Sequence, residues 1–376
     1  MTHPFRNGMA KATALIRAGN LTEATVRIQA MLRGAPDTPE PDPDMIEGTF
    51  TAVDPAAHRA DPARRKPLGE TLRTLARGKM PGTGGRKTDP ANQDPRFTTH
   101  TCSGPEGSRD YMLYVPSGAA ASTMPVPVIV MLHGCTQSPL DFAAGTGMNR
   151  LAEAQGFIVV YPAQPTAANM NKCWNWFRPG DQARGAGEPA VLAAITRAVL
   201  ATQNADPARV YVAGLSAGGA AAMVLAREYR DVFAAVGVHS GLAAGAARDV
   251  AQAFAAMQGG AAGEMGKPGV PAIVFHGTAD PTVAVANAGA VARQAQAGLT
   301  GQRGVRRDTA AGGRGYEVAL LTADDGRTLS EVWLIDGAGH AWAGGSMAGS
   351  YADPAGPDAS AEMVRFFAQH RVIRSA

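Results

Sequence analysis

Short apolar runs alternate with longer amphipathic stretches from about residue 96 to the end of the chain. Val126–Leu132 and Phe157–Tyr161 contain almost no polar side chain, which is typical of strands that are covered on both faces. Further strands are expected at 109–115, 210–213, 232–239, 272–276, 316–322 and 331–335, and helices at 140–155, 190–201, 217–229 and 360–370. Buried strands that alternate with helices predict an α/β fold, with a mostly parallel sheet and helices on both faces.

The first 95 residues have a different pattern. Apolar positions in 4–33 recur at helical spacing with a break at Gly19-Asn20, which predicts two short amphipathic helices joined by a turn. Residues 34–95 are rich in Pro, Gly and charge, and they carry too few large apolar side chains to offset the entropy of ordering. The expected organisation is therefore an N-terminal helical segment (1–33), a mobile linker (34–95) and an α/β domain (96–376).

Composition removes several classes of function. Apolar residues make up 45% and charged residues 18% of the chain, which is ordinary for a globular protein. The net charge of +3 comes without a long basic run, so nucleic acid is not an expected partner. No stretch is apolar enough for a membrane span, and the N-terminus shows no apolar signal-peptide core, which favours a cytoplasmic location.

One glycine-rich turn carries the strongest chemical signal. Gly214-Leu-Ser216-Ala-Gly218 follows a predicted strand directly and precedes a predicted helix directly. This is the context of a nucleophile elbow, where a serine on a tight turn projects its hydroxyl above the sheet edge. The turn leaves no room for side chains at its flanking positions, which accounts for both glycines. The pattern predicts an α/β-hydrolase fold with Ser216 as the nucleophile.

A serine hydroxyl needs a base, and in this fold an acid and then a histidine follow the serine along the chain. His340 lies in the loop after the last predicted strand, which is the position expected of the base. His239 and His276 each end a strand and are expected as core or neighbouring side chains, while His370 is expected to be solvated on the terminal helix.

Asp280 lies four residues beyond the strand that ends at His276, and it is expected to orient the imidazole of His340. Two alternatives remain at this stage. Asp280 could instead form a turn before Pro281, and Asp336 could compete for the same role, although its closeness to His340 in sequence favours a part in shaping the loop.

The oxyanion hole is expected after an early strand. His133-Gly-Cys-Thr-Gln137 follows Val126–Leu132, and such a loop supplies one backbone N–H while the residue after the nucleophile supplies the other. The expected donors are the amides of Cys135 and Ala217. Gly134 would allow close approach of the substrate, and Gln137 would either contact the substrate or brace the loop.

Taken together, the motifs resemble the polyhydroxybutyrate depolymerase family of esterases, in the branch near feruloyl esterases. The segments that carry the resemblance are His133–Gln137, Cys173–Phe177, Gln182–Glu188, Gly214–Gly219, His276–Asp280, Gly339–Trp342 and Gly356–Asp358. The resemblance covers roughly 96–372 and implies an α/β-hydrolase fold, no cofactor, and hydrolysis of short hydroxyacyl polyesters or oligomers. It also implies Ser216, Asp280 and His340 as the catalytic triad, and it offers an extracellular location as the alternative.

Aromatic and cysteine residues gather near these motifs. Trp174, Trp176 and Trp342 are expected to form an apolar wall for the substrate, with core packing as the alternative for Trp176. A bridge between Cys135 and Cys173 would tie the aromatic loop to the oxyanion loop. No cysteine pair has the spacing of a zinc or redox motif, so no metal site is expected.

Three functions remain open. The first is a serine esterase that acts on hydroxyacyl polyesters, and the second is a general carboxylesterase of feruloyl or acetyl-xylan type. The third is an inactive domain whose N-terminal helices bind a partner. In either enzyme, the helices of 4–33 could also dock on a polymer surface or another protein.

Overall fold

The computed structural model describes residues 94–267 and 269–372. The predicted helical segment (1–33) and all but the last two residues of the predicted linker (34–95) lie outside the described residues.

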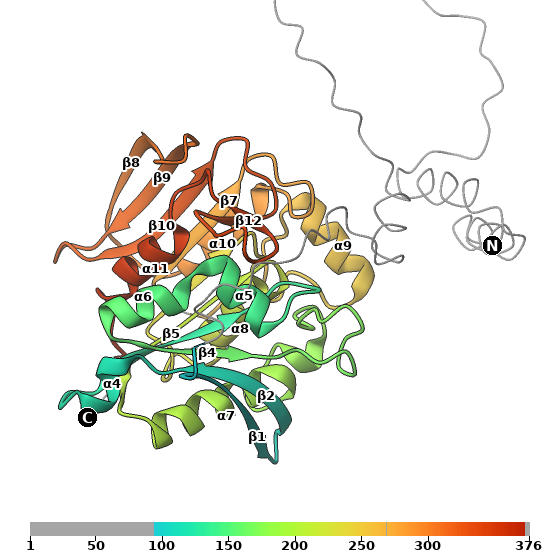
Figure 1. Cartoon of the computed structure of the whole chain (residues 1–376). Coiled ribbons are helices and arrows are strands. Elements are labelled where there is room, and N and C mark those ends of the chain that lie inside the picture. Colours follow the sequence, from blue (N-terminus) through green and yellow to red (C-terminus); the bar gives the residue numbers. More distant parts are fainter. Residues whose placement is uncertain (1–93, 268, 373–376) are drawn as a thin grey trace, which may run out of the picture. The chain divides into compact units, whose positions relative to one another are not determined.

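A ten-stranded sheet forms the centre of the described part (Figure 1). The strands, in spatial order, are β1 (Phe97–Gly104), β2 (Gly107–Tyr114), β4 (Ile158–Pro162), β3 (Val126–Leu132), β5 (Ala205–Leu215), β6 (Ala235–His239), β7 (Ala272–Gly277), β10 (Thr328–Ile335), β9 (Gly315–Thr322) and β8 (Gln302–Thr309). From β4 to β10 all neighbours pair in parallel, whereas antiparallel pairs complete both edges. The predicted parallel sheet is confirmed for its six central strands.

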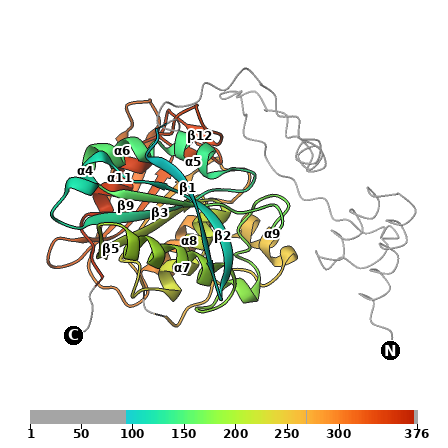
Figure 2. The same ribbon diagram turned by 60° about the horizontal axis from the view of Figure 1, so that its bottom comes forward.

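Helices cover both faces of this sheet (Figure 2). They are α4 (Ser117–Ala121), α5 (Pro139–Thr146), α6 (Met148–Gln155), α7 (Gly187–Thr202), α8 (Ala217–Glu228), α9 (Val250–Gly259), α10 (Ala286–Ala295) and α11 (Ala359–Phe367). Side chains of α7, α8 and α10 enter one apolar core, and those of α5, α6 and α11 enter the other. This arrangement is the α/β-hydrolase fold that the elbow motif predicted.

Some elements differ from the sequence expectation. The helix expected over 140–155 is two helices, because Gly147 adopts a left-handed conformation with φ of 62°. β1, β8, α9 and α10 were not expected. Every position of β8 is exposed, so this edge strand has no apolar alternation that would reveal it.

Four histidines are buried in the folded domain. Burial lowers the pKa of His133 to about 4, of His239 to about 3 and of His370 to about 4, and it also lowers the pKa of His276. The expectation of a solvated His370 is wrong. The terminal helix ends at Phe367, and in the turn that follows the His370 ring packs on Phe366, so that this residue is only 2% exposed.

We predict that the melting temperature falls steadily as the pH drops from 6.5 to about 4. The unfolded chain protonates these imidazoles near their ordinary pKa of 6.5, whereas the fold keeps His133, His239 and His370 neutral to about pH 4 or below and lowers the pKa of His276 as well. The unfolded state therefore binds more protons within this window, and their contribution to stability, complete above pH 6.5, is lost as the pH falls. Calorimetry at constant ionic strength measures the slope, and His370→Gln should reduce it. A melting temperature that stays constant across the window would contradict this account.

Candidate active site

The candidate residues follow the carboxyl ends of four parallel strands. β3 leads into the loop of His133, β5 ends at Leu215 directly before Ser216, β7 leads to Asp280, and β10 leads to His340. Because these strands run in the same direction, their loops meet at one edge of the sheet, where ligands bind in open α/β folds.

Ser216 occupies a strained turn between β5 and α8. Its φ of 58° and ψ of −121° are rare for a residue with a side chain, and its N–H donates to the carbonyl of His239 at 2.9 Å. A Cβ at Gly218 would lie 2.1 Å from the carbonyl oxygen of Leu132, and a Cβ at Gly214 would lie 2.4 Å from the backbone of Gly218. Both glycines are therefore required by close backbone contacts, and Ser216 remains partly exposed.

Asp280 and His340 form a hydrogen-bonded pair. The Nδ1 of His340 lies 2.8 Å from Oδ2 of Asp280, whose side chain is fully buried, while that of His340 is 10% exposed. The other carboxylate oxygen accepts from the N–H groups of Thr282 and Val283, both at 2.9 Å. Burial by itself raises the pKa of Asp280, but the hydrogen bond and charge of His340 and these N–H donors outweigh it, and the pKa lies below its ordinary value. The carboxylate is therefore ionised and can only accept, which places the proton of the pair on Nδ1.

His239 connects the Ser216 turn with the segment that follows His340. Its backbone carbonyl accepts from the N–H of Ser216, and its Nε2 accepts from the N–H of Ala343 at 3.0 Å. Its ring stacks between Phe275 and Trp342. Within the part of the chain that the structure describes, Ser216 Oγ forms no hydrogen bond to His340. Such catalytic contacts are often long before substrate binds.

The loop after β3 presents a free backbone donor. The N–H of Cys135 has no hydrogen-bond partner among the described residues, and the N–H of Ala217 belongs to the first turn of α8, where intrahelical partners are lacking. His133 braces the loop as a neutral ring, because Nδ1 donates to the carbonyl of Gly134 and Nε2 accepts from the N–H of Gln164.

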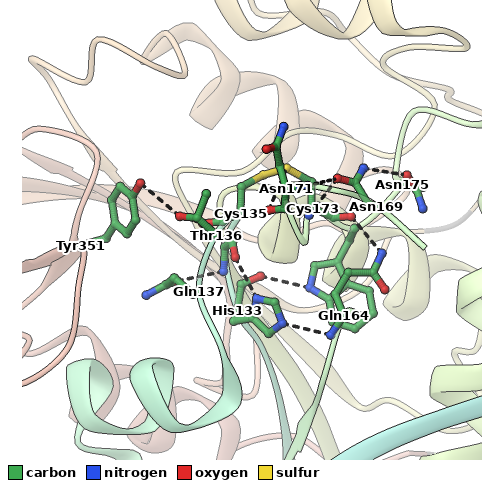
Figure 3. Close-up of a disulfide and its surroundings, with 12 residues drawn as sticks. His133, Cys135, Thr136, Gln137, Gln164, Asn169, Asn171, Cys173, Asn175 and Tyr351 are labelled. Carbon is green, nitrogen blue, oxygen red and sulfur yellow. Dashed lines mark hydrogen bonds between the residues drawn. A yellow bond between two sulfur atoms is a disulfide. The ribbon is translucent and has the colours of Figure 1, made fainter. Parts of the chain in front are cut away.

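A disulfide joins this loop to the aromatic loop (Figure 3). Cys135 and Cys173 are bridged, as hypothesised, and the N–H of Thr136 donates to the carbonyl of Asn171 at 2.7 Å beside the bridge. The indole N–H of Trp174 donates to the carbonyl of His133 at 3.0 Å. Cys102 is a free thiol.

A buried carboxyl group, which sequence reasoning missed, supports the aromatic loop. Glu188 accepts from the backbone N–H and the side chain of Asn175, both at 2.7 Å, and from the side chain of Gln164 at 2.5 Å. Burial raises the pKa of Glu188, and these hydrogen bonds act in the opposite direction. The sequence feature that could have identified Glu188 is its position at the end of the Gln182–Glu188 motif.

Gln137 braces the loop instead of lining a pocket. Its side chain is 2% exposed, its Oε1 accepts from the N–H of Gly134 at 2.9 Å, and its Nε2 donates to Asp141 at 3.0 Å and to the carbonyl of Ser350 at 3.1 Å. Gly134 is also buried, with the backbone and side chain of Leu215 beside it. Of the two roles expected for Gln137, the bracing one matches these contacts.

The expected tryptophan wall has a different place in the structure. Trp174 is 0%, Trp342 1% and Trp176 7% exposed, so all three are core side chains that a substrate could reach only after rearrangement. Two of them make contacts within the protein core. The indole N–H of Trp342 donates to the hydroxyl of Ser360, and the ring of Trp176 packs edge-on against Phe177. Trp333, which lies on β10, is also a core residue.

Two cavities that the structure shows lie away from the candidate residues. They are surface cavities of about 430 and 360 Å³, one beside Arg96 and the other beside Trp333, and neither is lined by Ser216 or His340.

Among the described residues, no helix is long and apolar enough to cross a membrane, and no group of three or more potential metal ligands occurs.

We predict that loss of the bridge destabilises the domain. The bridge closes a loop with a sequence separation of 38, for which chain-entropy arguments give about 4 kcal/mol. Urea denaturation of the double variant Cys135→Ala/Cys173→Ala measures the loss in the free energy of unfolding. The matched control is Cys102→Ala, which removes the free thiol and should leave stability unchanged. Equal stability of the double variant and the control would refute the prediction.

Comparison with known proteins gives a consistent result. A family model described as esterase PHB depolymerase matches residues 109–314. Poly(3-hydroxyalkanoate) depolymerase C of Paucimonas lemoignei is 35% identical over 250 residues, which are 62% of this chain and 58% of that protein. Feruloyl esterase B of Neurospora crassa is 38% identical over 146 residues, or 39% of this chain and 48% of that protein. The alignments thus span about half of each relative.

The solved structure of an acetyl xylan esterase from Aspergillus awamori has the same fold. It aligns with a TM-score of 0.55 at 19% identity, covering 72% of this chain and 99% of that one. The family model spans more than half of the present chain and includes the elbow, the oxyanion loop and the Asp280 loop. The chain therefore belongs to the esterase PHB depolymerase family.

Proposed function

We propose that the chain is a serine hydrolase that cleaves carboxylic esters, with Ser216, Asp280 and His340 as its catalytic residues. The observation that carries this proposal is the hydrogen-bonded pair of Asp280 and His340 at the sheet edge where the strained Ser216 turn also lies. Family membership supports the same reaction class.

The charge distribution supports a defined order of proton transfers. With the Nδ1 proton held by Asp280, Nε2 of His340 is the unprotonated nitrogen and accepts the proton of Ser216 as the hydroxyl attacks the ester carbonyl. The resulting imidazolium is stabilised by the ionised Asp280 and then protonates the leaving alcohol. Water attacks the acyl-enzyme by the same route, which releases the acid and restores Ser216.

The backbone N–H groups of Cys135 and Ala217 are the proposed oxyanion donors. Both come from segments whose position is fixed by backbone packing, since Gly218 lies against Leu132 at the end of β3. Fixed dipoles need no reorganisation when the negative charge develops on the carbonyl oxygen, and one such donor is worth about 10²–10³ in rate.

The proposed substrates are esters of short hydroxyacyl units, as oligomers or as accessible polyester. The depolymerase of Paucimonas lemoignei supports this class, and so do apolar side chains on loops that contact the oxyanion segment. Met170 is 87% exposed beside Asn171, and Met347 is 74% exposed in the loop that precedes Tyr351. The match to feruloyl esterase B favours, as a second candidate, a general carboxylesterase of feruloyl or acetyl-xylan type.

The proposed compartment is extracellular or otherwise oxidising. The disulfide between Cys135 and Cys173 supports it, because cytosolic reductants keep thiols reduced, and it weighs against the cytoplasmic location expected from the N-terminal sequence. Docking of the helices predicted in 4–33 on a polymer surface or another protein remains part of the proposal.

We predict that Ser216→Ala abolishes hydrolysis of p-nitrophenyl butyrate and release of 3-hydroxybutyrate from amorphous polyhydroxybutyrate. The loss should reach several orders of magnitude, because only oxyanion stabilisation and binding remain. Wild-type activity on both substrates supports the polyester function, whereas activity on the small ester alone favours the general carboxylesterase. An active Ser216→Ala variant would show that the nucleophile is another residue.

We also predict that Asp280→Asn lowers kcat about 10³–10⁴-fold, because the amide favours the wrong imidazole tautomer. The matched control is Asp336→Asn, which changes the exposed carboxylate that the sequence left as a competitor, and it should retain wild-type kcat. Steady-state kinetics on p-nitrophenyl butyrate give both values. The reverse ranking of the two variants would assign the acid to Asp336.

A further inference from the structure

Tyr351 has a backbone conformation that a bulky side chain rarely adopts. Its φ is 53°, in the left-handed region, although the residue is neither glycine nor asparagine. Such a conformation is energetically unfavourable and persists only where the surrounding contacts enforce it. Backbone strain of this kind clusters at functional sites, so the position of the side chain matters.

Contacts on both sides of Tyr351 enforce this conformation. Its carbonyl accepts from the N–H of Trp342 at 2.7 Å, next to the two-residue strands β11 (Trp342–Ala343) and β12 (Ala352–Asp353). The preceding Ser350 donates its N–H to Asp141 at 3.1 Å, and its carbonyl accepts from Gln137 at 3.1 Å. The segment is therefore clamped onto α5 and the oxyanion loop.

The hydroxyl of Tyr351 points towards Thr136 in the loop after β3 (Figure 3). The centre of its ring lies 6.4 Å from that of the His340 ring, in an edge-on arrangement, and its hydroxyl lies 3.4 Å from Oγ1 of Thr136. Tyr351 is half-buried and Thr136 is exposed, so their contact lies at the surface of the loop that also carries the proposed oxyanion donor at Cys135.

The phenol proton of Tyr351 is available to a ligand. Thr136 already donates its hydroxyl proton to the carbonyl of Cys135 at 2.6 Å, so in the contact between the two hydroxyls Tyr351 is the donor. At 3.4 Å this contact is long for an O–H···O bond, whose usual distance is about 2.7–2.8 Å. A substrate oxygen at normal distance would form the stronger bond.

We propose that Tyr351 is a specificity-determining residue that donates a hydrogen bond to a second oxygen of the substrate, beyond the scissile ester. In a hydroxyacyl oligoester this acceptor is the hydroxyl or ester oxygen on the β-carbon of the acyl unit, close to the carbonyl that Ser216 attacks. A plain alkanoyl ester lacks this oxygen. The inference rests on the proposed ester hydrolysis at Ser216 and names the substrate feature that the site selects.

The test compares wild type with Tyr351→Phe on a matched pair of esters, p-nitrophenyl 3-hydroxybutyrate and p-nitrophenyl butyrate, using the full chain. The measured quantity is the ratio of kcat/KM for the hydroxylated ester to kcat/KM for the plain ester. A neutral hydrogen bond is worth enough to lower this ratio about fivefold in Tyr351→Phe. The kcat/KM for the plain ester should change by less than about twofold, because the phenyl ring and its packing remain.

Tyr316→Phe is the control, since Tyr316 lies on β9, packs on Trp333 and has no part in the proposed site. It should leave the ratio unchanged, and melting temperatures verify that both variants fold. An unchanged ratio in Tyr351→Phe overturns the proposal, and so does an equal fall with both esters, which indicates a purely structural role. A wild type that cleaves neither ester overturns the proposed function itself, and this inference with it.

Discussion

The contact of the Ser216 turn with the end of β3 determines the geometry of the site. Gly218 lies so close to the carbonyls of Leu132 and His133 that a methyl group would overlap both. This close contact between Gly218 and the end of β3 fixes the start of α8, and therefore the Ala217 amide, relative to the loop that carries the Cys135 amide. The proposed nucleophile and the proposed oxyanion donors are thus positioned by close backbone contacts, and the side chains around them support that arrangement.

Buried polar groups supply this support, and most act between segments that are distant in sequence. His239 ties the elbow to Ala343, Gln137 ties the oxyanion loop to Ser350, and Glu188 holds Asn175 beside the disulfide. Neutral imidazoles suit this role, because each ring offers one donor and one acceptor without the cost of burying a charge. Buried neutral imidazoles also make the fold sensitive to acid, because the unfolded chain binds protons at a pH where the buried rings stay neutral.

The sequence predicted those features that depend on local pattern. The elbow follows from glycines flanking a serine between a strand and a helix, and Asp280 and His340 follow from their places after strands in the chain order of the fold. Burial of Trp174 and Trp342 could not be predicted, because an aromatic residue in a loop has the same local pattern whether it points inward or outward. Tyr351 gave no signal, since its conformation depends on contacts of the preceding Ser350 with Gln137 and Asp141, more than two hundred positions away in sequence.

Strain has a common location in this domain. Among the described residues, the non-glycine positions with positive φ are Thr136, Lys172, Ser216, Ser240 and Tyr351, and each lies in a loop at the candidate site. Each strained residue lowers the stability of the domain by about 1–3 kcal/mol. The hydrogen bonds that hold these loops, the disulfide and the buried histidines have to compensate for this loss. Selectivity in the proposed site comes from fixed donors like the Tyr351 hydroxyl, because only a substrate with an acceptor at the matching position gains the hydrogen bond.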